Sequence, residues 1–512
     1  MLKCILPIKI YMTGISDLKW SSDFISQTPG DNTAENFPRQ VLNACWSHVI
    51  PSIVPNPKMI IWSEEMANIL KIDKIEIDLL SGNSLCPGMA PYAQCYGGHQ
   101  FGSWAGQLGD GRAITLGEIN SEFGKLELQL KGSGVTPYSR FADGKSVLRS
   151  SIREFLCSEA MHHLGVPTTR ALSLCTTGEK IIRDVLYDGN HSTEDGAIVC
   201  RVAPSFIRFG SFQIHAFRGD ITSLRNLVNY TIKTHFSHLN STGDQLLIDW
   251  LKEVIESTAS MIIHWMRVGF VHGVMNTDNM SIHGLTIDYG PYGWIENYDS
   301  HWTPNITDIS TARYRFGQQS NIAGWNLARL LESISPLFNN TDELHNLMLH
   351  YDTYFSKEYE NMWCKKLGIL EYDTKLIDDL IQLFHENEVD MTIFFRKLAM
   401  INQSNFSSIS ESFYGSKLSQ DWINWLTLYL EYVIPKRGKI MNSINPKYVL
   451  RNWMVQLAIE KAENKDYSLL NELFELIKLP YDEQFDFESK WHQKRPDWAK
   501  NKVGCSMLSC SS

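Results

Sequence analysis

The first half of the chain shows both hydrophobic periods, one typical of strands and one typical of helices. Over residues 126–131 three leucines alternate with Glu, Gln and Lys, which predicts a strand with one apolar and one polar face. Residues 146–164 place apolar side chains at helical spacing, and strand patterns return near 181–185 and 197–202. We therefore predict a sheet-rich first half that is interrupted by one long helix.

The second half has a predominantly helical pattern. Apolar residues recur at helical spacing over 246–268, 325–334 and 422–433. Before the sheet, residues 13–60 are rich in Pro, Asn and Ser, which predicts an irregular arm. Residues 63–70 begin with Ser-Glu-Glu and predict a short, N-capped helix.

This order of elements predicts the α+β class and a protein-kinase-like bilobal fold, with a β-rich N-lobe and a mainly helical C-lobe. In such a fold the nucleotide binds between the lobes. The expected divisions are an N-terminal arm with short helices over 1–90, a kinase-like N-lobe over 91–215, a helical C-lobe over 216–490 with a catalytic and metal loop at 271–291, and a cysteine-containing tail over 491–512.

Composition narrows the class of protein further. The formal net charge of −10 argues against a nucleic-acid binder, because phosphate contacts need a basic surface. No run approaches 18 apolar residues, so we expect no membrane-spanning helix. The ten cysteines form no CxxC pair, which disfavours a zinc site or a disulfide framework. We expect a monomer in a reducing compartment: the cytoplasm of a bacterium, or the mitochondrion if the source is eukaryotic.

One segment carries the pattern of a phosphoryl-transfer loop. Small-molecule kinases have His-Gly-Asp, four residues and Asn, followed by a strand that ends Ile-Asp-x-Gly. Here His272-Gly273 matches the start, Asn279 stands at the spacing of the metal-binding Asn, and Asp288 precedes Tyr289-Gly290 as the second metal ligand. Mg²⁺ prefers such oxygen ligands and bridges phosphate oxygens.

One position of this loop does not match the kinase pattern. Val274 stands where those kinases have the catalytic Asp, and a valine side chain cannot accept a proton. The nearest carboxylate is Asp278, beside Asn279. Either the base has moved, or the enzyme is inactive, or Asp278 and Asn279 form an Asx turn before a strand.

A glycine-rich segment at 96–112 is a candidate phosphate-binding loop. Glycines let backbone N–H groups approach phosphates closely, although β-hairpins use glycine as well. Gly109 and Gly111 precede Arg112, a cation placed where a polyphosphate would lie.

Further charged residues extend the candidate site. Lys131 ends the alternating strand and Glu154 lies on the following helix, the arrangement by which kinases position a phosphate-binding lysine. The alternative for both is a solvated surface position. The loop at 132–144 could close over nucleotide. Arg201 and Arg208 lie seven positions apart, which would place them on one face of a helix, but Pro204 between them disfavours that helix. They could equally be surface residues.

The histidines and serines give no signature of a hydrolase. His99, His162, His163 and His272 do not form a ligand pattern such as HExxH, and no GxSxG motif occurs.

Taken together, these motifs resemble the selenoprotein O family of kinase-like protein adenylyltransferases, in its bacterial type with Cys in place of selenocysteine. The resemblance covers nearly the whole chain. It rests on 35–41, 92–112, 128–155, 201–212 and 272–291, and the run Met275-Asn276-Thr277-Asp278-Asn279-Met280-Ser281-Ile282 is highly specific.

The resemblance implies an activity and a role for each matching residue. Members of this family bind ATP in an inverted pose and transfer AMP to Ser, Thr or Tyr hydroxyls of proteins, with Mg²⁺ or Mn²⁺. Asp278 is then expected to be the catalytic base, and Asn279 and Asp288 the metal ligands. The expected nucleotide contacts are Gly109, Gly111, Arg112, Lys131, Asp143, Gly144, Arg201, Arg208 and Asp288, with Glu154 supporting the lysine.

Three alternatives remain open at this point. They are UMP transfer from UTP with Mn²⁺, an atypical phosphotransferase, and a nucleotide-binding pseudokinase scaffold that signals through its tail thiols.

The C-terminal tail departs from the family pattern. Family members end in a compact Cys-Ser-(Cys or selenocysteine)-Ser-Ser, whereas Met507 and Leu508 here lie between Cys505 and Cys510. Some bacterial members also carry a cysteine after Asp-Tyr-Gly-Pro that pairs with the tail, and Tyr292 stands there in this chain. The expectation is a flexible tail with two accessible thiols, or an inert frayed end.

Overall fold

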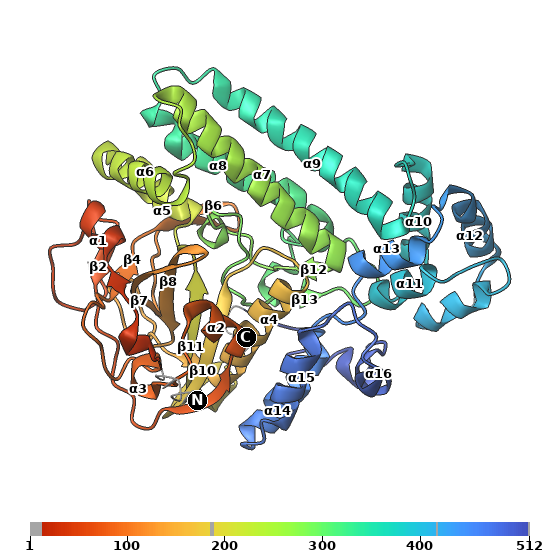
Figure 1. Cartoon of the computed structure of the whole chain (residues 1–512), viewed down its shortest axis with the longest axis horizontal. Coiled ribbons are helices and arrows are strands. Elements are labelled where there is room, and N and C mark those ends of the chain that lie inside the picture. Colours follow the sequence, from red (N-terminus) through yellow and green to blue (C-terminus); the bar gives the residue numbers. More distant parts are fainter. Residues whose placement is uncertain (1–12, 185–188, 416–417, 510–512) are drawn as a thin grey trace, which may run out of the picture.

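The computed structural model describes residues 13–184, 189–415 and 418–509. An antiparallel sheet forms one side of the molecule, and a set of long helices forms the other (Figure 1). Two predictions, a strand end at Val185 and an accessible thiol at Cys510, lie outside the described residues.

The main sheet has nine strands within the described ranges. Seven follow the order β2-β4-β7-β8-β11-β10-β3, while β1 pairs with β7 and β9 pairs with β11. Its strands are β1 (Trp20–Ser21), β2 (Trp46–His48), β3 (Lys58–Trp62), β4 (Tyr92–Gln94), β7 (Ala113–Ser121), β8 (Gly124–Lys131), β9 (Ser146–Val147), β10 (Arg170–Asp184) and β11 (His191–Ala203). Two smaller pairs are β5 (Gly97–Gln100) with β6 (Ser103–Gln107), and β12 (Phe270–Val271) with β13 (Gly293–Trp294).

The prediction of an irregular arm over residues 13–60 is wrong in part. β1, β2 and most of β3 come from this stretch and pair with β7, β4 and β10 respectively. The strands are short and separated by Pro- and Asn-containing loops, so the local pattern carried no strand signal. Long-range pairing, rather than local preference, makes these residues extended.

The alternation predicted over 126–131 is present in β8, but its polar face does not meet solvent. The three leucines pack with α2 (Glu64–Leu70) and α3 (Ile77–Leu80) on one face of the sheet. Glu127, Gln129 and Lys131 point to the other face and are all buried. Buried polar side chains need partners, so this face is the first structural indication of a functional site.

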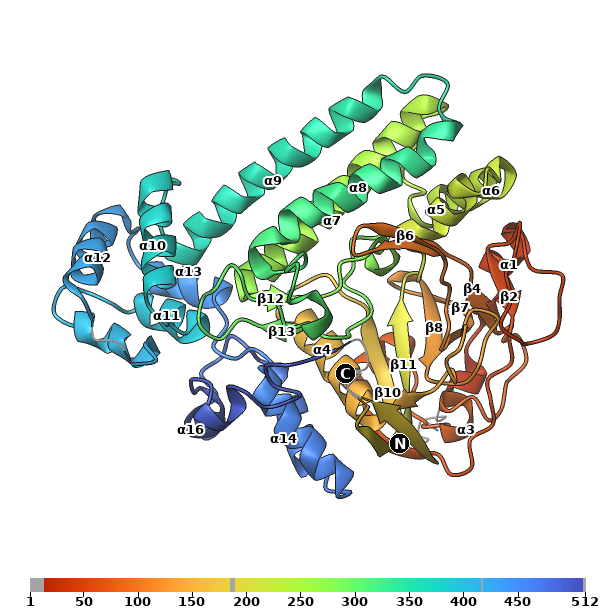
Figure 2. The same ribbon diagram turned by 180° about the vertical axis from the view of Figure 1, so that it is seen from behind.

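The described helices cover the sheet and build the second lobe. In addition to α2 and α3 they are α1 (Asp23–Gln27), α4 (Leu148–His163), α5 (Phe209–Phe217), α6 (Ile221–His235), α7 (Asp244–Val268), α8 (Gln319–Ile334), α9 (Glu343–Leu367), α10 (Thr374–Glu386), α11 (Met391–Leu398), α12 (Gln420–Tyr432), α13 (Arg437–Ile444), α14 (Asn452–Glu463), α15 (Ser468–Ile477) and α16 (Phe485–Trp491). Helices α7, α8 and α9 pack side by side, and α10 to α13 gather at one end of α9 (Figure 2).

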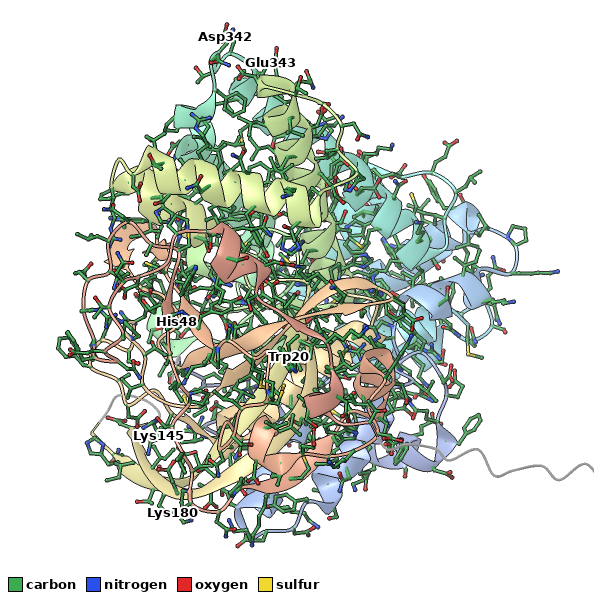
Figure 3. All side chains as sticks on the ribbon, turned by 60° about the vertical axis from the view of Figure 1, so that its left-hand side comes forward. Trp20, His48, Lys145, Lys180, Asp342 and Glu343 are labelled. Carbon is green, nitrogen blue, oxygen red and sulfur yellow. The ribbon has the colours of Figure 1, made fainter. Side chains whose placement is uncertain are left out.

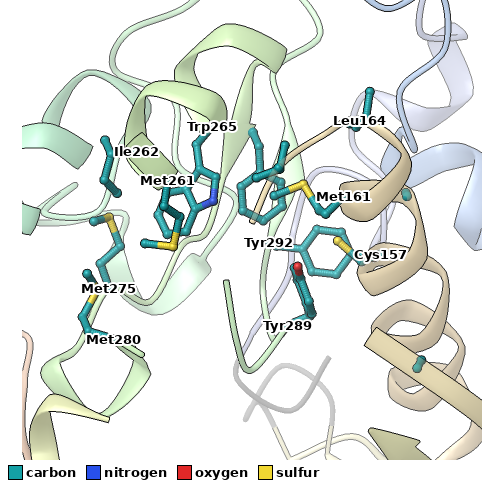
Figure 4. Close-up of a cluster of buried hydrophobic side chains, with 14 of the residues drawn as sticks. Cys157, Met161, Leu164, Met261, Ile262, Trp265, Met275, Met280, Tyr289 and Tyr292 are labelled. Carbon is teal, nitrogen blue, oxygen red and sulfur yellow. The ribbon is translucent and has the colours of Figure 1, made fainter. Parts of the chain in front are cut away.

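Helix α4 joins the two lobes. It packs on β10 and β11 and contacts α14 and α15. Cys157 and Met161 of α4 face Tyr289, near the end of the loop at 271–291, and Tyr292, directly after it, across a buried apolar cluster (Figure 4). The position of this helix is therefore coupled by packing to that loop.

These features confirm the predicted α+β, protein-kinase-like bilobal fold: a sheet-rich lobe with one long helix against it, followed by a helical lobe. Asp342 and Glu343 at the start of α9 lie at the top of the view in Figure 3, and Lys145 and Lys180 of the sheet lobe lie in its lower part. The boundaries between the four predicted segments stay predictions.

The described part of the C-terminal tail is packed against the protein, unlike the flexible tail that we predicted. The Ile306 N–H donates to the Leu508 carbonyl at 2.8 Å, and Leu508 is fully buried. Cys505 is also buried, and burial raises the pKa of its thiol to about 12, which disfavours the reactive thiolate. None of the described helices is both long enough and apolar enough to cross a bilayer.

Candidate active site

A cavity of about 750 Å³ opens between the polar face of the sheet and the loop at 271–291. Most of the predicted site residues line it. They are Gly109, Gly111, Arg112, Lys131, Asp143, Gly144, Arg201, Asp278, Asn279 and Asp288. The two remaining predicted residues form ion pairs with residues that line the cavity: Glu154 with Lys131, and Arg208 with Asp288. The structure therefore brings together residues that lie up to 179 positions apart in the sequence, from Gly109 to Asp288.

An ionic cluster forms the floor of the cavity. The Lys131 ammonium lies 2.7 Å from a Glu154 carboxylate oxygen and 3.3 Å from Asp288 Oδ1. Arg201, on β11 beside β8, donates to Glu154 at 2.9 Å and to Asp288 Oδ1 at 2.6 Å. The predicted Lys–Glu pair is thus present, and Arg201 and Asp288 extend it into a four-residue network.

Arg208 connects this cluster to the loop at 271–291. It is the N-cap residue of α5, and its NH1 group donates to Asp288 Oδ2 at 2.6 Å and to the Asp278 carbonyl at 2.7 Å. Its guanidinium also stacks over the Tyr96 ring, 4.4 Å from the centroid. Arg201 and Arg208 therefore do not share a helix. One lies on a strand and the other at a helix start, and they meet on Asp288.

Asp288 is held in an uncommon backbone conformation. Its φ of +57° lies in the left-handed region, where residues other than glycine are rare and which is typical of functional sites. Burial alone would raise the pKa of its carboxyl. Arg208, Lys131 and Arg201 outweigh that effect and hold the pKa well below its usual range. Asp288 is accordingly a fixed anion surrounded by three cations.

Asp278 is a buried carboxylate with spare hydrogen-bonding capacity. It lies in a short 3-10 helix (Thr277–Asn279), and its Oδ2 accepts a hydrogen bond from Gln100 at 3.3 Å. Its Oδ1 has no hydrogen-bond partner among the described residues. Burial is the main cause that raises its pKa, to about 6. A carboxylate of this kind can accept a proton near neutral pH.

The glycine-rich segment reaches the site in two separate places. Its first half forms the β5–β6 hairpin, where a Cβ at Gly98 would lie only 2.4 Å from Asp278 Oδ1. Its second half lines the cavity: Gly109 has a φ of +78°, and a Cβ there would lie 2.3 Å from the Tyr138 ring. Arg112 lines the cavity and has no salt-bridge partner among the described residues. Glycine is thus required for close approach to Asp278 as well as at the cavity wall.

The loop at 132–144 forms part of the cavity wall. Asp143 accepts two hydrogen bonds from the Arg183 guanidinium, at 2.8 and 2.9 Å. Gly144 has a φ of +69°, and a Cβ there would lie 2.2 Å from the Gly134 carbonyl oxygen. This bidentate pair and this close approach fix the position of the loop at the cavity wall.

The oxygen donors near Asp278 fit a hard divalent cation. Asn279 donates its side-chain amide to the Val274 carbonyl at 2.9 Å, which leaves its amide oxygen as the available ligand atom. Asn279, Asp278 and Asp288 all line the same cavity, and Mg²⁺ and Mn²⁺ prefer such carboxylate and amide oxygens.

Several site residues were not singled out from the sequence. Gln100, Tyr96 and Gly98 lay inside the quoted glycine-rich segment, but nothing local distinguished them from hairpin residues. Arg183 sits far from Asp143 in the sequence, and only the register of β10 brings them together.

The position after the Asp-Tyr-Gly-Pro turn holds Tyr292, which is fully buried. Its hydroxyl donates to the Arg153 carbonyl at 2.9 Å, and its ring lies 4.2 Å from the Arg153 guanidinium. A tyrosine packed in this way cannot pair covalently with the tail.

The comparisons with known proteins define the class of protein. The model of the family described as protein adenylyltransferase SelO matches residues 35–478. The chain belongs to this family and is an enzyme, a nucleotidyltransferase that modifies proteins.

Individual relatives are similar over nearly the whole chain. A protein of Flavobacterium johnsoniae, named protein nucleotidyltransferase YdiU, is 50% identical, and the alignment covers 97% of this chain and 100% of that protein. One of the same name from Tolumonas auensis is 51% identical, with 97% and 99% covered.

Solved structures give a weaker likeness. The protein-kinase-fold virulence factor ROP2 of Toxoplasma gondii, described as having no enzymatic activity, is 12% identical and has a TM-score of 0.24. The alignment covers 57% of this chain and 87% of that one. At this TM-score the likeness carries no part of the argument below.

Proposed function

We propose that this enzyme transfers AMP from ATP to Ser, Thr or Tyr hydroxyls of proteins and releases pyrophosphate. In this reaction the acceptor oxygen forms a bond to the α-phosphorus, and the bond from that phosphorus to the β-phosphate bridging oxygen breaks. The hydroxyl proton passes to the Asp278 carboxylate. Atoms and charge balance without a further reactant.

The observation that carries the proposal is the pairing of Val274 with Asp278. Val274 lines the cavity at the position where kinases have their proton acceptor, and its side chain cannot take a proton. Asp278, four residues on, is buried and has an oxygen without a hydrogen-bond partner among the described residues. A base displaced in this way does not face a γ-phosphate held in the usual kinase pose, so a different phosphorus must be attacked.

The cations of the site suit pyrophosphate as the leaving group. Lys131, Arg201 and Arg208 converge on Asp288, and Arg112 lies on the same cavity. Attack at the α-phosphorus places the developing negative charge on the β- and γ-phosphates. Cations fixed before the reaction stabilise that charge without a reorganisation cost.

The backbone of the two glycine-containing loops supports nucleotide binding at the same cavity. We assign Gly109, Gly111, Asp143 and Gly144 to positioning the nucleotide, because glycine lets the chain approach phosphates closely. Asn279 and Asp288 would hold a divalent metal, which supplies neutralisation of phosphate charge when bound. Glu154 acts through Lys131 and Arg201, which it holds in place.

The cysteines are consistent with an enzyme that acts in a reducing compartment. All eight described cysteines are free thiols, and most are buried. This supports the bacterial cytoplasm as the place where the enzyme meets its protein substrates.

The test compares the fate of two labels. The full chain is incubated with Mg²⁺, a generic acceptor protein and ATP radiolabelled at either the α- or the γ-phosphorus. We expect protein-bound label from the α position only, and its loss in the Asp278→Asn variant. Label from the γ position only would indicate a phosphotransferase, and no label from either would indicate a scaffold. A parallel reaction with α-labelled UTP and Mn²⁺ distinguishes UMP transfer, which is favoured if UTP labels protein faster than ATP.

A further inference from the structure

A second group of ligand-type side chains lies outside the active site, where α2 meets the end of α4. Glu65 is in the first turn of α2, and His162 and His163 are the last two residues of α4. The His162 Nε2 atom lies 3.2 Å from Glu65 Oε1, and the His163 Nε2 atom lies 3.4 Å from Glu65 Oε2. All three ligand atoms lie within 4.8 Å of one another.

The types of these ligand atoms suit a small four-coordinate cation. Zinc binds imidazole nitrogen and carboxylate oxygen at about 2.0–2.1 Å in tetrahedral geometry, which separates neighbouring ligand atoms by about 3.3 Å. Each imidazole faces a different oxygen of Glu65, and the three ligand atoms already lie within 4.8 Å of one another, so an ion would draw them together by small side-chain movements. Three protein ligands of this type leave the fourth position to water.

The local charge also suits a divalent cation. Arg170 NH2 lies 3.5 Å from Glu65 Oε1 and would compete with a metal ion if it were free. Glu159, however, binds the Arg170 guanidinium through two hydrogen bonds of 2.8 Å. One arginine and two glutamates leave a net charge of −1 around the two imidazoles.

The group is partly open to solvent. The His162 Nε2 atom is hydrogen-bonded to Glu65 Oε1 at 3.2 Å, and a bound ion would replace this contact. The side chains of Glu65 and His162 are 45% and 41% exposed, which gives an ion a path to the group.

We propose that Glu65, His162 and His163 form a binding site for one zinc-class divalent cation that ties α2 to the end of α4. Sequence patterns could not reveal this site, because the carboxylate lies 97 positions from His162 and the two histidines are adjacent. Binding would link the N-terminal arm to the helix that carries Glu154. Through mass action it would stabilise the folded chain against unfolding.

A second histidine-containing group provides a matched control. Asp299, His301 and His385 also gather, but the His301 Nδ1 atom is 3.8 Å from Asp299 Oδ1 and the two imidazole centroids are 6.0 Å apart. Asp299 Oδ1 is already occupied by the His301 backbone N–H at 2.8 Å.

The test titrates Zn²⁺ into the chelator-stripped full chain by calorimetry, in millimolar Mg²⁺ so that the oxygen ligands of the active site do not contribute. We expect one equivalent to bind, and Co²⁺ as a probe to give the visible absorption of tetrahedral coordination. His162→Gln or His163→Gln should each weaken binding roughly tenfold or more, and the double variant should abolish it. The His301→Gln/His385→Gln control should bind like the unmodified chain.

Thermal unfolding provides an independent readout. Zn²⁺ should raise the Tm of the unmodified chain and of the control, but not that of the His162→Gln/His163→Gln variant. Absence of Zn²⁺ binding by the unmodified chain, or retention of full affinity in the double variant, would overturn the proposal. If the double variant does not fold, Glu65→Gln tests the same site from α2: loss of binding supports it and full affinity refutes it.

Discussion

Two clusters of buried charge in this enzyme differ in the arrangement of their charges and in their access to solvent. Around Asp288 three cations, Lys131, Arg201 and Arg208, pair with Asp288 and Glu154. A third carboxylate, Asp110, lies 3.9 Å from Arg208, and the cluster faces a cavity of about 750 Å³. Around Arg451 one guanidinium binds Asp390 through two hydrogen bonds, at 2.7 and 2.9 Å, and also binds Glu296. The neighbouring cavity there is only about 10 Å³, about the volume needed for a single water molecule.

The two clusters shift the pKa values of Asp288 and Glu296 in opposite directions. Burial would raise the pKa of Asp288, but its three cations hold it well below the usual range. Burial, together with the charge of Asp390, raises the pKa of Glu296 despite Arg451. Three cations that converge on one carboxylate at an open cavity suit an anionic ligand, whereas an enclosed cluster in which one guanidinium binds two carboxylates can act only on the fold. Burial of charge alone therefore does not identify a functional site; the arrangement of the charges and their access to solvent do.

The largest effect should come from breaking the enclosed cluster. Asp390→Ala should lower the free energy of unfolding by about 3–5 kcal/mol, because Arg451 loses its bidentate partner while it stays buried. Urea unfolding measures this loss. The matched control is Asp373→Ala, since both aspartates cap a helix but Asp373 is not paired with an arginine in the described residues. The control should cost about 1 kcal/mol. Equal losses would show that the Arg451 pair contributes nothing beyond the cap.

The next effect concerns the cavity-facing site and should appear in turnover rather than stability. Asp278→Asn should lower kcat by roughly a hundredfold or more, because a general base is lost, while ATP affinity is kept. Asp288→Asn should lose both, since a proposed metal ligand is removed. The measurements are initial rates of protein labelling and ATP binding by calorimetry. Turnover at the unmodified rate in Asp278→Asn would remove this residue from the mechanism.

A smaller effect should follow from removing one cation of the open cluster. Lys131→Met should weaken ATP binding roughly ten- to hundredfold, the contribution of one charge-assisted hydrogen bond. AMP binding should change less, because AMP lacks the β- and γ-phosphates. Stability should change by no more than about 1 kcal/mol, since burial already lowers the pKa of Lys131 and Glu154 keeps Arg201 as a partner. Lys180→Met, on the surface beside Asp195, is the control and should leave both affinities unchanged. Equal losses for ATP and AMP would place Lys131 away from the triphosphate tail.

The elements with strong local periodicity could be predicted from the sequence. The strand at 126–131 and the helix at 146–164 have the predicted positions, because each carries a whole apolar face along a continuous stretch. The short strands β1 and β2 could not be predicted, since two or three residues hold no period and their pairing partners are distant.

The residues of the candidate site also fall into those that a local sequence pattern could predict and those that it could not. Asp288 and Asn279 were found because they keep a fixed spacing within one loop. The contact of Gln100 with Asp278 and the pairing of Arg183 with Asp143 depend on tertiary placement, and no local signal marks either. The packed tail was missed for a related reason. Its small residues suggest flexibility, whereas its order comes from pairing with Asn305 and Ile306.

The smallest effect should be a pH dependence that belongs to the enclosed cluster alone. Because burial raises the folded-state pKa of Glu296 above its unfolded value of 4.5, the folded chain binds more protons than the unfolded chain just above that pH. Stability from this group is therefore fully present below pH 4.5 and is lost as pH rises through the raised pKa. Glu296→Gln removes this titration and leaves the Arg451–Asp390 pair intact, so the variant should gain stability relative to the unmodified chain between pH 4.5 and 7. Urea unfolding at a series of pH values measures the difference, and Glu332→Gln, on the surface of α8, is the control that should show no such trend. The opposite outcome is a stability gain of Glu296→Gln over the unmodified chain that stays constant or falls as pH rises. That result would show that Arg451 fully compensates both carboxylates. The two clusters would then differ only in their access to solvent.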